Sequence, residues 1–167
     1  MDITTYSYYR DILPFLESVG IGVAESPLTA TTFLPGLELG QNVIYVDPDK
    51  LKYPGDILHE AGHIAVAQPH LRRLMGTDKM PEGWPELGEE IAAILWSYAA
   101  LTHLNIPPEF VFHPDGYKNC SQWYIEQFTG KNYIGLPLLQ WMGIAYTNQE
   151  VNNGHPPFPS IKNWMRP

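Results

Sequence analysis

One stretch of the chain, Ile57 to Ala67, reads ILHEAGHIAVA and decides how the rest of the sequence is interpreted. Its apolar residues recur at the three- and four-residue spacing of an amphipathic helix. Gln68-Pro69 follows, and proline ends a helix because its ring removes a backbone donor and clashes with the preceding turn. The stretch therefore predicts a helix with one apolar face.

Two histidines of this helix, His59 and His63, are four residues apart, so their imidazoles lie one above the other on one face. Both imidazoles can reach one metal ion. Glu60 lies about 100° further round the helix, where it can take a proton from a water molecule at the metal without ligating the metal itself. Gly62 leaves room for a neighbouring backbone. The pattern indicates a metal-dependent hydrolase; the alternative is a pair of surface histidines on an ordinary amphipathic helix.

A third metal ligand has to come from elsewhere in the chain, because a catalytic zinc usually has three protein ligands and one open position. The single cysteine, Cys120, excludes a multi-cysteine site, so the ligands must be histidines and carboxylates. Glu89 and Glu90 lie in the first turn of a second predicted helix, from Pro85 to about His103. This helix would run antiparallel beside the first, and its alanines permit a close approach. Either glutamate can complete the site.

The remaining segments predict short elements around these two helices. A helix is expected from Asp11 to Gly20, and β-prone pieces at Gly22-Val23, Thr31 to Leu34 and Asn42 to Val46 predict a small antiparallel sheet. Two weaker helices are expected later in the chain, and they are Ser121 to Phe128 and Pro137 to about Tyr146. A proline-rich tail, about 152–167, is expected to lie over the surface. The fold class is α+β.

Length and charge limit the possible functions. The 167 residues, 44% of them apolar, suit one domain spanning residues 1–167. The 18 Asp and Glu residues exceed the 10 Lys and Arg residues, and the net charge of −8 would repel a nucleic acid. No window approaches the roughly 20 apolar residues that cross a bilayer, and Met1 to Arg10 lacks the pattern of a signal peptide. We expect a cytoplasmic protein that binds neither nucleic acid nor membrane.

The segment from Asn42 to Ala100 resembles the zincin metallopeptidases, in their gluzincin branch. The resemblance rests on the His-Glu-x-x-His helix and on a glutamate from a following helix. In that branch the third ligand is commonly followed by a small residue three places on and by apolar residues two, five and six places on. Counted from Glu89, these residues are Ala92, Ile91, Ile94 and Leu95. The resemblance therefore favours Glu89, with Glu90 still open because Ala93 lies three places after it.

The resemblance implies a zincin-like minimal metalloprotease domain, with a small antiparallel or mixed sheet followed by the active-site helix and further helices. It implies a Zn²⁺ ion, a peptide or protein substrate, and Glu60 as the catalytic base of peptide-bond hydrolysis. Asn42 to Val46 falls where the family has an edge strand that pairs with an extended peptide. Position 93 is alanine, where many relatives have an Asp or Asn that orients a ligating histidine.

The oxyanion of the reaction usually needs a second donor besides the metal. The sequence leaves seven candidates open, and they are His103, His113, Tyr117, Tyr124, Tyr133, Tyr146 and His155. Two other functions also remain open. One is a catalytically silent protein that binds a partner peptide, and the other is a metal-dependent amidohydrolase that acts on a non-peptide substrate.

Overall fold

The computed structural model describes residues 3–29 and 32–167. Along these residues the elements follow the order α1 (Ile3–Ser18), β1 (Gly22–Glu25), β2 (Leu37–Gly40), β3 (Val43–Val46), α2 (Asp56–Val66), α3 (Pro69–Arg72), α4 (Leu87–His103), α5 (Pro108–Val111), the 3₁₀ turn η1 (Tyr117–Asn119), α6 (Ser121–Thr129), α7 (Leu136–Trp141) and α8 (Asn148–Asn152). The fold is therefore α+β, and the expected order of helix, small sheet and further helices is confirmed.

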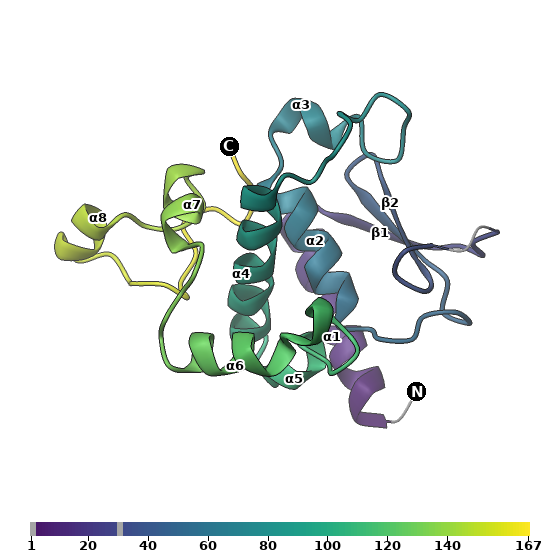
Figure 1. The fold of residues 1–167 in the computed structure, drawn as a ribbon, viewed down its shortest axis with the longest axis horizontal. Helices are drawn as coiled ribbons and strands as arrows, with labels where there is room; N and C mark the ends of the chain where they lie inside the picture. The colour runs from purple at the N-terminus through teal and green to yellow at the C-terminus, as the bar shows by residue number, and fades with distance from the viewer. Residues whose placement is uncertain (1–2, 30–31) are drawn as a thin grey trace.

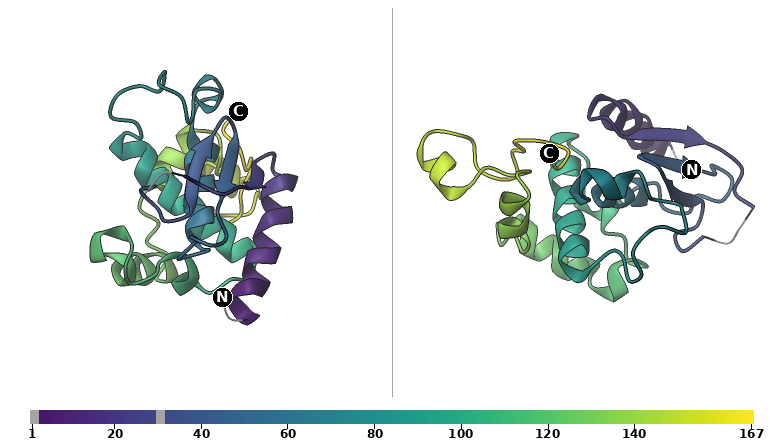
Figure 2. Two further views of the ribbon diagram at one scale, coloured as in Figure 1. Left: turned by 90° about the vertical axis from the view of Figure 1, so that its right-hand side faces the viewer. Right: turned by 90° about the horizontal axis from the view of Figure 1, so that it is seen from above.

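Helices α2 and α4 form the centre of the molecule and run antiparallel (Figure 1). The sheet lies beyond α2, and α7 and α8 lie beyond α4, as the view from above also shows (Figure 2). Helix α1 closes one side, where Phe15 packs against Trp96 of α4 with ring centroids 6.3 Å apart. Across residues 3–29 and 32–167, no helix combines the length and the apolar character needed to span a membrane.

Helix α1 begins eight residues before the predicted Asp11. The reason is that tyrosines extend its apolar face towards the N-terminus. Tyr9 is buried together with Ile12 and Leu16, and Tyr8 packs edge-on against Phe110 at 5.2 Å. A tyrosine-rich segment that reads as polar in the sequence therefore forms two further turns of helix.

The sheet is mixed, with the strand order β1-β3-β2. Strand β3 pairs in parallel with β1 and antiparallel with β2. The strand expected from Thr31 to Leu34 is wrong for residues 32–34, which precede β2, and Thr31 lies outside the described residues. The Pro35-Gly36 turn lies directly before the hairpin of β2 and β3 and does not end a strand. Gly36 turns the chain with a positive φ of 79°, and buried Leu37 then begins β2.

The expectation that Asn42 to Val46 is an edge strand is also wrong. Strand β3 is hydrogen-bonded on both sides, and its Ile44 and Val46 are fully buried. Strand β1, the parallel partner of β3, is an edge strand of the sheet. It spans Gly22 to Glu25 and is therefore two residues longer than the β-prone piece that the sequence predicted. An extended peptide could therefore add only to β1 or β2.

The two central helices approach closely at Gly62. A Cβ atom built at this glycine would lie 2.6 Å from the carbonyl oxygen of Ala93 in α4, so a larger residue would push the helices apart. From Ala92 to Leu101, every residue of α4 is buried. A helix that is apolar all round belongs in a core, and this one holds α2 in place along its length.

The tail does not simply lie over the surface, as the sequence predicted. Residues 152–157 are largely exposed, but Trp164 packs edge-to-face against Phe15, with centroids 4.9 Å apart. The indole of Trp96 donates a hydrogen bond to the carbonyl oxygen of Trp164 at 2.9 Å, and the backbone N–H of Arg166 donates to Ala65 of α2 at 2.8 Å. Aromatic burial and backbone pairing therefore anchor the segment to both central helices.

Candidate metal centre

Three side chains from α2 and α4 meet in one group that could hold a metal ion: His59, His63 and Glu90. The two Nε2 atoms are 3.1 Å apart. One carboxylate oxygen of Glu90 is 3.6 Å from Nε2 of His59, and the other is 3.3 Å from Nε2 of His63. The histidine side chains are only 12% and 7% exposed, whereas Glu90 is 37% exposed and leaves one side accessible.

These separations are close to the edges of a tetrahedral site. When a metal has bonds of about 2.0–2.1 Å to its ligands, neighbouring ligand atoms of a tetrahedron are about 3.3 Å apart. The two Nε2 atoms are 3.1 Å apart, and each lies 3.3 or 3.6 Å from a different oxygen of Glu90. To act as a single ligand, one of these oxygens has to turn towards both histidines, and one ligand atom from each residue already lies within 4.8 Å of the others. The three residues could therefore hold a small tetrahedral cation.

The carboxylate beside the histidines belongs to Glu90 and not to Glu89, which the sequence favoured. Helix α4 begins at Leu87 with Glu86 as its N-cap, so Glu89 takes the N3 position. From there Glu89 reaches back to accept a hydrogen bond from the backbone N–H of Glu86 at 3.4 Å, forming a capping box. Ala93, the small residue three places after Glu90, lies on the face of α4 that meets Gly62. Its small size was the sequence signal for Glu90.

The protonation states suit cation binding. Burial, reinforced by neighbouring His63, lowers the pKa of His59 from 6.5 to about 3, so its imidazole is neutral at neutral pH. A hydrogen bond with His63 lowers the pKa of Glu90, which is therefore a carboxylate. A neutral imidazole and a carboxylate are the forms in which these side chains ligate metals.

No side chain of the described residues forms a hydrogen bond with Nδ1 of either imidazole. The Nδ1 atoms of His59 and His63 are both buried without a partner in that part of the chain, and position 93 contributes no acid. The rings are held by aromatic packing instead. His63 lies edge-to-face with Trp84 at 5.7 Å, and His59 with Tyr117 at 5.5 Å.

Glu60 lies beside His59 on α2 and has an unusual acidity. Burial is the largest cause that raises the pKa of Glu60 from 4.5 to about 7, and the nearby carboxylates of Asp56 and Glu90 add to it against the opposing effect of His63. A carboxyl group with a pKa near 7 can both accept and return a proton at neutral pH. The sequence identified Glu60 but not Asp56, whose position four residues earlier on the same helix face was the available signal.

Of the seven candidate oxyanion donors, Tyr117 is the one whose ring contacts a histidine of this group. Its hydroxyl is buried, and the side chain of Ser97 is the polar group beside it. Burial, followed by the charges of Asp56, Glu90 and Glu60, raises the pKa of this hydroxyl well above 10, so it remains a donor. Tyr117, Lys118 and Asn119 all have positive φ, at 53°, 53° and 65°, and such local strain is common at functional sites.

The other six candidates have different partners. His113 binds Asp56 at 2.9 Å, and His103 packs against Phe15 and Trp164. The remaining rings lie in aromatic contacts away from the histidine pair, and they are Tyr124 on Phe112, Tyr133 on Phe158, and Tyr146 stacked on His155. Trp84, which was not identified from the sequence, contacts His63. Its position directly before Pro85, at the start of the predicted helix, was the only sequence signal for it.

Comparison of the chain with protein-family models, with curated proteins and with solved structures found no significant match. The chemistry of the centre therefore has to be argued from the geometry of His59, His63 and Glu90 and from the residues around them. These three side chains, one strained tyrosine and one carboxyl group with a raised pKa lie together at the junction of α2 and α4.

Proposed function

We propose that the protein is a zinc-dependent metallopeptidase of the zincin type, in the gluzincin branch, with Glu90 as its third ligand. The observation that carries the proposal is the set of ligand-atom separations, 3.1 to 3.6 Å, together with Glu60 next to His59 on the same helix. Two histidines and one carboxylate leave a fourth tetrahedral position for a reactant, as in catalytic zinc sites.

A zinc ion held by these residues would supply Lewis acidity towards a carbonyl oxygen and would lower the pKa of water. Glu60 accepts the proton of the attacking water and returns it to the amine that leaves. The pKa of about 7 that burial gives Glu60 suits both transfers. The burial of the histidines limits the access of bulk water to the reacting groups.

Tyr117 has the role of second donor to the oxyanion. Its hydroxyl is buried beside the side chain of Ser97, and it lies in the field of the Glu60 and Glu90 carboxylates. A donor held in place before the reaction stabilises developing negative charge without having to reorganise. The strained turn at residues 117–119 fixes the position of this ring against His59.

The test combines metal analysis with one substitution. Purified protein should contain about one zinc per chain by elemental analysis, and a chelator should remove both the metal and the hydrolysis of a peptide library. Glu60→Gln should lower hydrolysis by roughly 10²- to 10⁴-fold, as expected for loss of a general acid-base, while the metal content stays unchanged.

Four results would contradict the proposal. A protein without bound metal removes its basis, and full hydrolysis by Glu60→Gln removes the role of that residue. Bound zinc without hydrolysis of any peptide would indicate a silent peptide-binding protein instead. Hydrolysis of small amides but of no peptide would indicate an amidohydrolase.

A further inference from the structure

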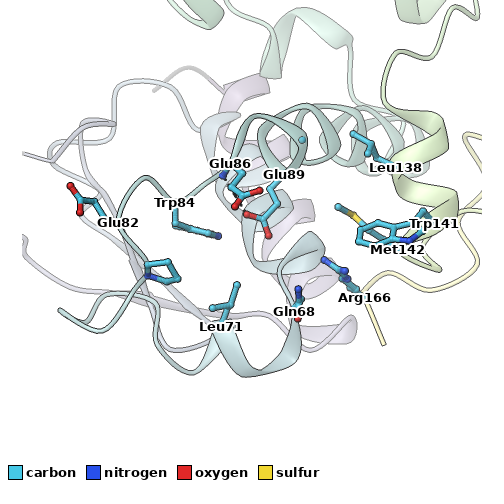
Figure 3. A pocket seen from close by; sticks show the side chains of 12 residues that line it. Gln68, Leu71, Glu82, Trp84, Glu86, Glu89, Leu138, Trp141, Met142 and Arg166 are labelled. Atoms are coloured by element: carbon cyan, nitrogen blue, oxygen red, sulfur yellow. Dashed lines mark hydrogen bonds between the residues drawn. The ribbon is translucent and has the colours of Figure 1, made fainter.

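A cavity of about 310 Å³ lies beside the metal centre, between the start of α4, the end of α2 and the α7 region (Figure 3). Trp84 connects the two sites, because its indole both lines this cavity and packs against His63. In Figure 3 the indole nitrogen of Trp84 points towards the interior, beneath Glu89. This nitrogen is buried and has no hydrogen-bond partner among the described residues.

Most of the cavity lining is apolar, and its charged side chains are predominantly acidic. Glu82, Glu86 and Glu89 all line it, against the single cation Arg166. None of the three carboxylates forms an ion pair with any residue in the described parts of the chain. Glu89 also accepts a backbone hydrogen bond, but a carboxylate has about four acceptor positions, so capacity for a cationic ligand remains.

The opposite wall already binds a guanidinium group. The guanidinium carbon of Arg166 lies 4.9 Å from the ring centroid of Trp141, whose side chain is 73% exposed. Planar guanidinium groups stack on indole faces in this way. The cavity thus contains a second indole, Trp84, and the apolar side chains of Leu71 and Leu138, against which an aliphatic stem can pack.

We propose that this cavity binds an arginine side chain of the peptide substrate, next to the bond that is hydrolysed. That the bound peptide is a substrate rests on the proposed function, whereas the binding of arginine rests on the cavity alone. Arginine fits better than lysine because its planar fork can bind a carboxylate in bidentate fashion while it stacks on Trp84. The volume is at the lower end for ligand sites, roughly 300–1,000 Å³, and suits one long side chain.

An anionic ligand fits less well. Arg166 is the single cation of the lining, and its guanidinium is already held by Trp141 and by a hydrogen bond to the carbonyl oxygen of Val66 at 3.3 Å. The carboxylates of Glu86 and Glu89 lie across the cavity from it, whereas that of Glu82 lies at the rim and points outward (Figure 3). The overall charge of −8 adds to the attraction for cationic peptides.

The test measures binding by calorimetry to zinc-loaded Glu60→Gln protein, with three blocked pentapeptides that differ only in the central residue: arginine, citrulline or glutamate. Citrulline keeps the shape of arginine without its charge. The arginine peptide should bind about tenfold more tightly than the citrulline peptide, as expected for one charge-assisted contact. Adding Glu89→Gln, which neutralises the carboxylate directed into the cavity, should remove most of this preference. Trp141→Ala should weaken it without disturbing the fold, because Trp141 is exposed.

Glu17→Gln is the matched control, since Glu17 is an exposed glutamate on α1 that does not line the cavity, and it should leave the preference unchanged. Equal affinities for the three peptides, or no binding of any of them, would overturn the inference. Hydrolysis without a preference for arginine would overturn it and leave the proposed function standing. Preferential binding of the arginine peptide to a protein that hydrolyses nothing would support the cavity and contradict the proposed function.

Discussion

Two groups of histidine and carboxylate lie along α2, and they differ in how completely they pair. At its start, the imidazole of His113 donates to Asp56 at 2.9 Å, so that one N–H meets one carboxylate. One turn further on, the Nε2 atoms of His59 and His63 face each other at 3.1 Å. Two N–H groups would repel at that distance, so at least one Nε2 presents a lone pair. At Nε2 the first group is paired with a carboxylate, although Nδ1 of His113 is buried without a partner among the described residues. The second group presents a lone pair beside a carboxylate, where a cation could bind.

The largest loss of stability is expected from breaking the pair of His113 and Asp56. His113→Ala leaves the buried carboxylate of Asp56 without its partner, and such a change destabilises a fold by about 3–5 kcal/mol. Urea unfolding in the presence of a chelator measures the loss. The double variant Asp56→Asn/His113→Ala should recover part of it, because no unpaired charge remains. A loss below about 1 kcal/mol in the single variant would show that the pair does not hold the start of α2.

The next largest effect is expected on zinc binding at the group of His59, His63 and Glu90, where two neighbouring glutamates can be compared. Glu90→Gln should weaken zinc binding by more than about 100-fold, because loss of a ligand costs more than loss of an outer hydrogen bond. Glu89→Gln is the matched variant and should leave the zinc affinity close to that of the wild type, because Glu89 serves the helix cap. Competition with a zinc-binding dye measures both. An equal loss in the two variants would contradict the assignment of Glu90.

The smallest effect is a pH dependence of the metal-free fold. The pKa of His59 is about 3 in the folded chain against 6.5 unfolded, so its contribution to stability is present above pH 6.5 and is lost as the pH falls towards 3. Between pH 7.5 and 5.5 this contribution should fall by about 1.4 kcal/mol. Glu60, whose pKa is raised to about 7, acts in the opposite direction over the same interval, so the contribution of His59 is the difference between chelated wild type and His59→Gln. Denaturant unfolding of both proteins at both pH values measures it. The same pH dependence in both proteins would assign it to other groups.

The sequence predicts the two central helices well, because their signals are local. Helix α2 is expected from Ile57 to Ala67 and extends over Asp56–Val66, and α4 is expected from Pro85 and begins at Leu87. Apolar spacing and flanking prolines determine both helices without reference to the rest of the chain. His59, Glu60 and His63 follow directly, since one helical turn fixes their relative positions.

The third ligand and the sheet depend on distant contacts, and the sequence determines them poorly. One residue along a helix turns a side chain by about 100°, so the choice between Glu89 and Glu90 needs the cap and the phase of α4. Strands of four residues carry too weak a pattern to show that β3 has partners on both sides. Tyr117 contacts His59 because the turn at residues 117–119 is strained, and no residue pattern in the sequence predicts that turn.

The glycine at position 62 has a consequence for ion selectivity. Because the glycine lets the backbones of α2 and α4 come into contact, the two histidines and Glu90 lie at separations suited to a small cation, and a larger residue at position 62 would widen them. Calcium requires six to eight oxygen ligands at about 2.3–2.6 Å, which two imidazoles and one carboxylate at this spacing would not supply. A residue without a side chain thus limits the radius of the ion that its neighbours could accept.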